Sequence, residues 1–335
     1  MINLRNEKGT VLIFALWALG LLAFLAVTVG ILCRQKILLF SSLERKSQLR
    51  FLADAGVKQS VKLVSANKAS LTAPIKMFMH NDKSGSFIID GLNYKVTMMY
   101  EEPSDDLQSK ESHLGVVDEE RKLNLNEASF SEIKELVRSV LGLEERGALN
   151  IAASFIEWRE GVKEEIVQFL KEDSYGRLNY PPKKGRFETL DEILLVEGMS
   201  ADLYERLIPF VTIYGDGKVN INTAPYPVLS ALGLKDKVIR KVMAFRRGND
   251  AQEATADDNV FFGSHMVIEQ LQSFTELSQE EIDQVDSLNV SFRLKTTSDY
   301  FFVQSRGKFK MSNEIKTIQC VYDSLDKRFL YWREI

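Results

Sequence analysis

The longest apolar stretch of the chain lies close to its N-terminus, from Thr10 to Cys33, and runs for 24 residues without a charged side chain. A helix rises about 1.5 Å per residue, so this length crosses a hydrocarbon layer of roughly 30 Å while satisfying its own backbone polar groups. A cleavable secretory signal is the alternative, but its apolar region usually spans only about 7–15 residues before a small-residue cleavage site. The pattern therefore predicts a retained transmembrane helix.

Helical spacing continues beyond this stretch, to about Asn67. Five apolar residues recur near one face of such a helix: Leu49, Leu52, Val57, Val61 and Val64. Charged residues fall largely elsewhere, as on a helix packed against a core. Gly56 lies within this expected helix, where glycine costs up to about 1 kcal/mol relative to alanine. A close contact with another element, which only glycine would allow, would explain its presence. One continuous helix from Thr10 would be about 85 Å long. The alternative is a membrane anchor joined to a separate core helix.

Short segments rich in β-branched and aromatic residues lie on both sides of the central part of the chain. Ser86–Asp90 and Tyr94–Glu101 predict two strands around a turn, and the acidic segment Glu101–Ser112 after them predicts a solvated loop. Four more strands are expected near the C-terminus: Val290–Lys295, Tyr300–Arg306, Glu314–Asp323 and Phe329–Arg333. Their short connections predict an antiparallel meander.

An internal repeat occupies the region between these strands. The segment LNLNEAS, with Asn124 and Asn126, is echoed 96 residues later by VNINTAP, with Asn220, Asn222 and Pro225. Each copy is followed by a helical stretch, a Gly-Leu step, another helical stretch and a basic end. Between the copies, 189–195 has the pattern of a capped helix. The region from about 124 to 285 is therefore expected to be largely α-helical.

The order of these elements predicts the fold class. A long helix with strands, then helices, then more strands indicates an α+β domain interrupted by an all-α insert domain built on the internal repeat. The length of 335 residues agrees with two or three domains.

Charge and cysteine content narrow the function classes. The formal net charge is −4, so the chain lacks the excess of basic residues that is typical of a nucleic-acid-binding protein. The two cysteines, Cys33 and Cys320, lie at the end of the expected membrane helix and in a predicted strand, so no disulfide framework is expected.

The chain has no pattern typical of an enzyme. The histidines are scattered (His80, His113 and His265), and there is no C-x-x-C, P-loop or nucleophile elbow. DNA binding is one candidate function, because 195–199 followed by a helix resembles half of a helix-hairpin-helix unit. Acidic residues dominate its surroundings, and phosphate contacts dominate DNA affinity, so we expect no nucleic-acid partner.

The first nine residues, MINLRNEKG, resemble a prepilin leader: they are short and charged, and end in glycine directly before the apolar helix. The resemblance implies cleavage by prepilin peptidase between Gly9 and Thr10, with the apolar helix kept in the mature protein. Most pilin-like subunits carry glutamate at the fifth mature position, where this chain has Phe14. The minor pseudopilin K of type II secretion is the branch that lacks this glutamate.

Three stretches resemble the type II secretion system protein K family: GKVNINTAP at 217–225, LNLNEAS at 123–129 and FETLDEILLVEGMSADLYERLIPFVTIYG at 187–215. The resemblance implies a pilin-like fold, with a long N-terminal transmembrane helix packed on an antiparallel sheet and a large helical insert. The expected division is a leader at 1–9, a transmembrane helix at 10–33, a pilin-like helix with the first strands at 34–122, the insert at 123–286 with related units near 123–161 and 219–248, and the closing strands at 287–335.

The resemblance also implies function and partners. It places the protein at the tip of a periplasmic pseudopilus, which it helps to initiate and cap. The partners would be minor pseudopilins I and J, the major pseudopilin, prepilin peptidase, the inner-membrane assembly platform and membrane lipid. Family members can bind calcium, and one loop here offers oxygen ligands of the kind that hard cations use: Asp250, Glu253, Asp257, Asp258 and Asn259. No EF-hand spacing is present, so a solvated acidic loop is the alternative.

Two features of the sequence predict opposite orientations of the chain in the membrane. Lysine and arginine are abundant just after the membrane helix, which by the positive-inside tendency would leave the C-terminal part in the cytoplasm. The leader implies the reverse, a single-pass inner-membrane protein with its C-terminal domain in the periplasm. We favour the leader, because it is a specific processing signal and the charge bias is statistical.

Overall fold

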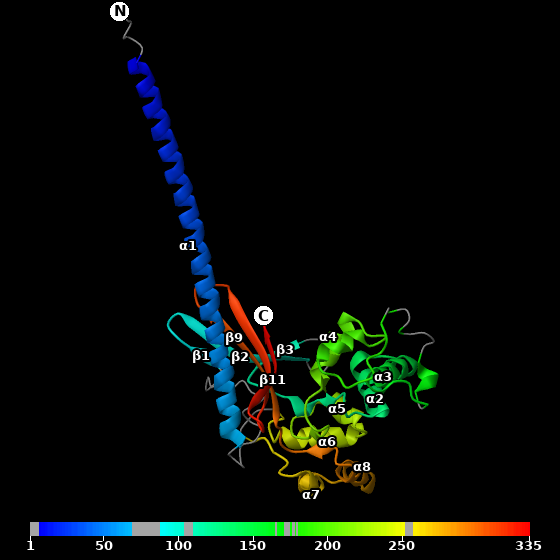
Figure 1. Cartoon of the computed structure of the whole chain (residues 1–335). Coiled ribbons are helices and arrows are strands. Elements are labelled where there is room, and N and C mark those ends of the chain that lie inside the picture. The colour runs from blue at the N-terminus through cyan, green and yellow to red at the C-terminus, as the bar shows by residue number, and fades with distance from the viewer. Residues whose placement is uncertain are drawn as a thin grey trace, which may run out of the picture.

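The computed structural model describes residues 7–68, 88–103, 110–164, 166–170, 175, 178, 180–251 and 257–335. A single helix, α1 (Glu7–Lys68), runs for 62 residues, or about 90 Å, and its first half projects from the rest of the molecule (Figure 1). It is long and apolar enough to cross a membrane, and none of its most apolar window is buried in the protein. The expected continuous helix is confirmed, and the alternative of two separate helices is wrong.

Among the described residues, seven strands form one sheet: β1 (Ile88–Asp90), β2 (Tyr94–Pro103), β3 (Lys110–Leu114), β4 (Val117–Asp118), β9 (Tyr300–Phe309), β10 (Ile315–Asp323) and β11 (Arg328–Glu334). The main order is β1-β2-β9-β10-β11, with β3 on β2 and β4 on β9. Every neighbouring pair is antiparallel. The predicted C-terminal meander is therefore confirmed for β9, β10 and β11.

The second half of α1 packs on one face of this sheet. Ala53 and Val57 of α1 are buried in the same cluster as Val303 and Cys320 of the strands. Gly56 allows the contact, because a Cβ there would overlap the Ser305 side chain of β9. The close packing predicted at Gly56 is confirmed.

The helical insert has its own buried cluster of side chains. Its α-helices are α2 (Phe130–Leu141), α3 (Glu145–Glu160), α4 (Ala201–Leu207), α5 (Tyr226–Ala231), α6 (Asp236–Arg246), α7 (Val267–Phe274) and α8 (Gln279–Val290). Its 3-10 helices are η1 (Glu119–Arg121), η2 (Val167–Phe169), η4 (Leu190–Leu195), η5 (Ile208–Phe210) and η6 (Ser264–Met266). Two short parallel pairs join its ends: β5 (Leu123–Asn124) with β6 (Val211–Thr212), and β7 (Val219–Asn220) with β8 (Leu294–Lys295).

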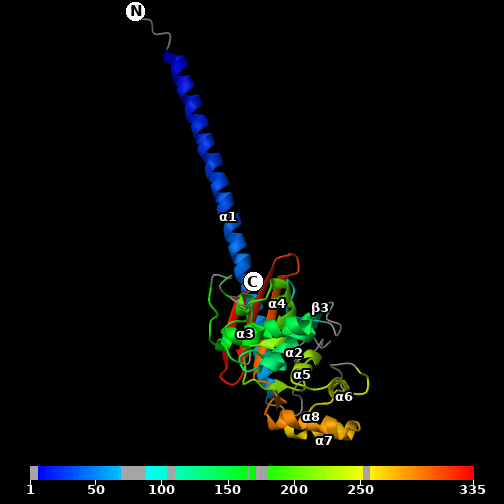
Figure 2. The same cartoon turned by 90° about the vertical axis from the view of Figure 1, so that its right-hand side faces the viewer.

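The layers are α1, the sheet and the insert, in that order. Figure 1 shows α1 and the insert on opposite sides of the sheet, and in Figure 2 the insert helices lie in front of the strands. Side chains alternate accordingly along β9, since Phe301 and Val303 pack under α1 while Phe302 and Gln304 face the insert. The predicted pilin-like α+β fold with a helical insert is thus the observed one.

Two expectations about local structure are wrong, and a third holds with a different type of helix. The segment Val290–Lys295 is not one strand, because α8 continues through Val290 and only Leu294–Lys295 pairs, with β7. The predicted loop Glu101–Ser112 is partly strand, since β2 extends to Pro103 and pairs with β3. Backbone pairing holds β3 in the sheet although its sequence, KESHL, is mostly polar. The predicted helix at 189–195 is the 3-10 helix η4, with Glu192 capping it as expected.

Ser86, at the start of the first predicted strand, lies outside the described residues, as do 104–109 of the predicted loop. His80 is also outside them.

Candidate functional site

The chain enters the insert through five consecutive charged residues, 118–122, and all five are buried. Asp118 accepts hydrogen bonds from the Asn220 amide and the Thr223 hydroxyl, at 2.9 and 2.6 Å. Arg121 Nε donates to the Thr223 carbonyl at 2.9 Å. A buried charge is costly unless it is paired and hydrogen-bonded, and these partners come from the second repeat about 100 residues away. The segment therefore joins the sheet to the insert through a polar buried junction.

The rest of the junction is made of two buried ion pairs. Lys122 Nζ lies 2.5 Å from Glu119 Oε1, and Lys295 Nζ lies 2.7 Å from Glu120 Oε1. Glu120 Oε2 also accepts the backbone N–H of Asp299 at 2.7 Å. Burial raises the pKa of Glu120 to about 7, against the opposing effects of Lys295 and of the Asp299 N–H. This carboxyl is therefore the titratable group of the junction with a pKa close to neutral pH.

The first repeat places both of its asparagines in the interior. Asn124 Oδ1 accepts the N–H of Asn126, and its Nδ2 donates to the carbonyls of Tyr214 and Gly215. Asn126 binds the backbone of Phe187 at both ends, accepting its N–H at 2.8 Å and donating to its carbonyl at 3.0 Å. The first asparagine makes a turn, and the second holds a distant segment against it.

The second repeat has the same arrangement. Asn220 Oδ1 accepts the N–H of Asn222, and Asn222 holds the backbone N–H and carbonyl of Phe261 at 2.8 and 2.9 Å. Pro225 is the N-cap residue of α5, as Ser129 is of α2. The repeat predicted from sequence is therefore a repeat of structure, and its asparagines are buried architectural residues.

An arginine completes each repeat. Arg159, at the end of α3, donates to the carbonyls of Leu125 and Ala128 at 2.5 and 2.8 Å. Arg246, at the end of α6, donates to the carbonyl of Ala224 at 2.6 Å. The basic end that follows each pair of helices in the sequence thus satisfies the backbone at the start of its own unit.

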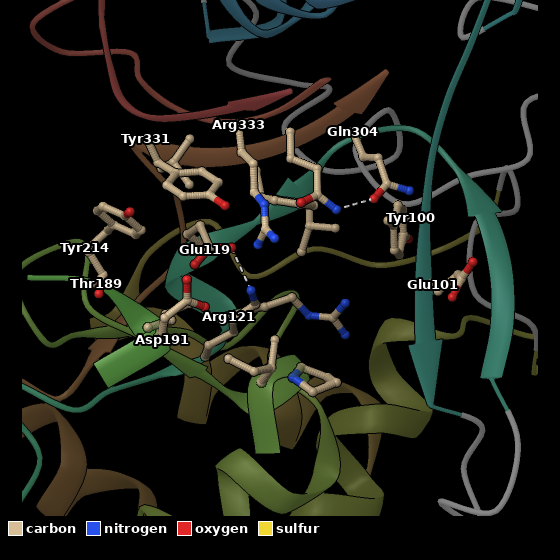
Figure 3. A pocket seen from close by; sticks show the side chains of 18 of the residues that line it. Tyr100, Glu101, Glu119, Arg121, Thr189, Asp191, Tyr214, Gln304, Tyr331 and Arg333 are labelled. Carbon is tan, nitrogen blue, oxygen red and sulfur yellow. Dashed lines mark hydrogen bonds and ion pairs between the residues drawn. The ribbon is translucent and has the colours of Figure 1, made fainter. Parts of the chain in front are cut away.

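A cleft of about 460 Å³ separates the insert from the sheet face turned away from α1 (Figure 3). Gln304, Tyr331 and Arg333 line it from the strands, and Asp191 and Tyr204 line it from the insert. In Figure 3 Arg333 reaches in from the strand side and Asp191 lies on the opposite wall. The volume falls in the range of roughly 300–1,000 Å³ that is usual for ligand pockets.

The walls of the cleft are polar and aromatic. The Tyr204 hydroxyl donates to Asp191 at 2.7 Å, and burial together with this carboxylate raises the pKa of Tyr204. The pKa of Arg333 is raised, first by its hydrogen bond with Tyr331 and then by nearby charges that include Asp191. Such a surface offers hydrogen-bonding and charged groups to a partner.

The predicted calcium loop is only partly within the described residues, because Glu253 lies outside them. Asp257 accepts the backbone N–H groups of Asn249 and Asp250, and the Asn259 amide donates to the Phe245 carbonyl. Across the described part of the chain, no group of three or more His, Cys, Asp or Glu residues could hold a metal ion. Calcium binding through Asp250, Asp257, Asp258 and Asn259 stays a prediction.

The residues of the expected leader cleavage lie at the start of α1. Gly9 and Thr10 are exposed on its first turns, and Phe14 is exposed one turn further on. Cleavage between Gly9 and Thr10 stays a prediction.

Sequence reasoning did not identify the buried charges at 118–122, the two phenylalanines held by the repeat, or the cleft. Five charged residues in a row resemble a solvated segment, so composition gave no signal for their burial. The spacing of Phe187 and Phe261 from their asparagines, 61 and 39 residues, differs between the copies and hides the correspondence.

Part of the chain is similar in sequence to known proteins. The family model described as "Type II secretion system (T2SS), protein K" matches residues 116–216, which contain the first repeat and the junction. A curated relative, "Type II secretion system protein K" of Dickeya chrysanthemi, is 33% identical over 102 residues. That match covers 29% of this chain and 28% of the relative, so the chain spans little more than a quarter of the relative's length in this comparison.

A solved structure shares the fold. It is described as "The Crystal Structure of the GspK-GspI-GspJ complex from enterotoxigenic Escherichia coli Type 2 Secretion System". The similarity has a TM-score of 0.59 at 14% sequence identity and covers 88% of this chain and 98% of that chain. The chain is therefore similar to the type II secretion system protein K family across the junction and first repeat, and it shares the fold of the solved chain over nearly its whole length.

Proposed function

We propose that this protein is a minor pseudopilin that assembles with pseudopilins I and J at the tip of a periplasmic pseudopilus. One observation carries the proposal: a single helix joins an exposed apolar half to a pilin-like sheet that bears a large insert. The similar solved chain was crystallised in a complex with GspI and GspJ, which supports these partners. In this role α1 anchors the protein in the inner membrane, and the sheet and insert lie in the periplasm.

The part of α1 beyond the membrane segment offers the contact surface for these partners. Leu43 and Phe51 remain exposed, although neighbouring residues of α1 are buried against the sheet. Exposed apolar side chains along a helix are typical of a surface that packs on another helix.

Co-purification of the full chain with pseudopilins I and J in detergent tests the proposal. Phe51→Asp is expected to reduce recovery of both partners about tenfold or more, because it buries a charge at the helix contact. Phe292→Asp, on an equally exposed phenylalanine at the end of α8, is the matched control and should leave recovery unchanged. Absence of any complex with the unmodified chain would refute the proposal.

Processing is tested separately by mass spectrometry of the membrane-inserted protein. We expect the mature chain to begin at Thr10, after prepilin peptidase has removed Met1–Gly9. An intact Met1, with the folded part protected from protease added outside spheroplasts, would overturn both the processing and the orientation.

A further inference from the structure

The two edges of the sheet differ in length and exposure. One edge is β1, with three residues, and the other is β11, with seven. On β11 the side chains of Phe329, Leu330 and Trp332 are 44, 38 and 40% exposed. Natural proteins usually shorten, charge or cover sheet edges, because an open edge binds any compatible strand. Within the described residues, β11 pairs with β10 alone, so its outer edge is open.

The register of β11 identifies the backbone groups at this edge. Thr317 and Ile335 exchange two hydrogen bonds, at 3.0 and 2.9 Å, so they form a hydrogen-bonded pair. Such pairs alternate along an antiparallel ladder with pairs whose N–H and C=O groups point away. The pairs Ile318–Glu334 and Cys320–Trp332 are therefore of the second kind. Trp332 and Glu334 thus present their backbone groups to the open edge.

The side chains of β11 alternate between two surroundings. Trp332 lies opposite Cys320, which is buried under α1, and Glu334 makes an ion pair of 2.9 Å with Arg50 of α1. Tyr331 and Arg333 point to the other face and line the cleft. Figure 3 shows both entering the cleft from the strand side. A strand added beside β11 would therefore place every second side chain at the mouth of the cleft.

The lining of the cleft carries a small excess of positive charge, with Lys122 paired with Glu119, Arg306 with Glu101, and Arg333 near Asp191. The lining contains four cationic residues (Arg121, Lys122, Arg306 and Arg333) and three carboxylates (Glu101, Glu119 and Asp191). This excess of one positive charge lies in a chain with a net charge of −4. Four tyrosines also line it, and tyrosine and arginine are the side chains that contribute most at protein-binding hot spots.

We propose that the open edge of β11 and the cleft form one binding site for an extended acidic segment of another protein. The segment adds to the sheet as an antiparallel strand, with main-chain hydrogen bonds to Trp332 and Glu334. Its alternate carboxylates enter the cleft toward Arg333. A second copy of β11 fits less well, because its own cleft-side residues are Tyr331 and Arg333, and two such arginines would repel each other. The site does not depend on the proposed pseudopilin partners.

Alternating peptides test the chemistry and the direction of the added strand. A fluorescein-labelled peptide of five Glu-Val repeats is titrated into the full chain in detergent micelles, and anisotropy is measured. We expect saturable binding, and none for the matched Lys-Val peptide. In the antiparallel register the valines lie opposite Trp332 and Glu334, so their N–H groups bind β11. N-methylation of the valines should therefore weaken binding at least about tenfold, and N-methylation of the glutamates should not.

Variants and amide exchange test the location. Arg333→Ala is expected to weaken the Glu-Val peptide about tenfold. The matched control is Arg328→Ala, on the same strand but paired with Asp323 and Asp326 outside the cleft, and it should not change affinity. The peptide should slow hydrogen exchange at the amides of Trp332 and Glu334, while Tyr331 and Arg333, already bonded to β10, keep their rates. Absence of saturable binding, equal binding of the acidic and basic peptides, or unchanged exchange at Trp332 would overturn the proposal.

Discussion

The side chain of Asn222 holds the backbone of Phe261 at both ends: Oδ1 accepts the phenylalanine N–H at 2.8 Å and Nδ2 donates to its carbonyl at 2.9 Å. Nδ2 also donates to the carbonyl of Thr296 at 3.0 Å. A carboxamide can do this because it carries a donor and an acceptor side by side, as a peptide group does. Asn126 makes the equivalent pair with Phe187, so in both copies the second asparagine holds a segment from beyond its unit against the start of that unit.

Asn222→Asp tests how far the insert depends on this contact. The substitution keeps the shape but replaces the Nδ2 donor with an oxygen that faces two buried carbonyls. We expect a loss of about 1–3 kcal/mol in the free energy of unfolding, measured by denaturant titration at neutral pH. Asn126→Asp should cost a similar amount, and Asn313→Asp, at an exposed turn between β9 and β10, should cost almost nothing. Equal stability of all four proteins would contradict the structural role of the repeat.

Gly307→Ala tests the contact between the sheet and α1. A Cβ at Gly307 would lie 2.9 Å from two backbone atoms of α1, the Leu49 oxygen and the Ala53 nitrogen, which cannot move aside singly. We expect a loss of about 1–3 kcal/mol in stability, measured by thermal unfolding of the sheet and insert within the full chain.

The control for Gly307→Ala is a glycine substitution that is expected to raise stability. Gly147 lies in α3, and a Cβ there would meet only Leu143, at an ordinary distance of 3.7 Å. Gly147→Ala should therefore raise stability by about 0.5–1 kcal/mol through helix propensity. If both variants lowered stability alike, crowding against α1 would not explain the effect at Gly307.

Local patterns predicted the elements that depend on local sequence. The long helix follows from one apolar stretch and the periodic residues after it, and β9 and β10 follow from side chains that alternate between the two faces of the sheet. Gly56 predicted the close contact of the helix with the sheet, because a glycine in the middle of a helix is destabilising unless a contact requires it. These features need no knowledge of the rest of the chain.

The junction could not be predicted in this way. Asp118 is stable in the interior because Asn220 and Thr223 bind it, and Glu120 because Lys295 and Asp299 bind it. These partners lie 102 to 179 residues away in the sequence. The strand β3 was missed for a related reason, since its polar residues are held by backbone bonds to β2 that side chains do not reveal. The open edge of β11 could not be predicted either, because it depends on the order of the strands in the sheet, which local sequence patterns do not show.

The reactivity of Cys320 tests the packing of α1 on β10. This thiol is buried, and burial, followed by the charge of Asp54, raises its pKa to about 12. The thiolate is the reactive form, so we expect a Cys33→Ser chain to resist maleimide while folded and to react fully in denaturant. Mass spectrometry of the labelled protein measures both states. Rapid labelling of the folded chain would show that α1 does not cover this strand.

The pH dependence of stability tests the junction through Glu120. Its pKa rises from 4.5 to about 7 in the folded chain, mainly through burial, so the folded state binds the proton more tightly than the unfolded state. The tighter proton binding at Glu120 contributes fully to the free energy of unfolding below about pH 4.5, and this contribution is lost as the pH rises through 7. Its size is of the order of 3 kcal/mol. Glu120→Gln removes this titration.

The difference between the unmodified chain and Glu120→Gln isolates this carboxyl from all other groups. We expect the unmodified chain to lose stability relative to the variant between pH 5 and 8, measured by denaturant unfolding at several pH values. The charge of Lys295, 2.7 Å away, acts in the other direction. If that charge outweighed burial, the carboxyl would be ionised in both the folded and the unfolded state, and the difference in stability would stay constant between pH 5 and 8. A falling difference therefore shows that burial governs the entrance to the insert, and a constant one shows that the ion pair does.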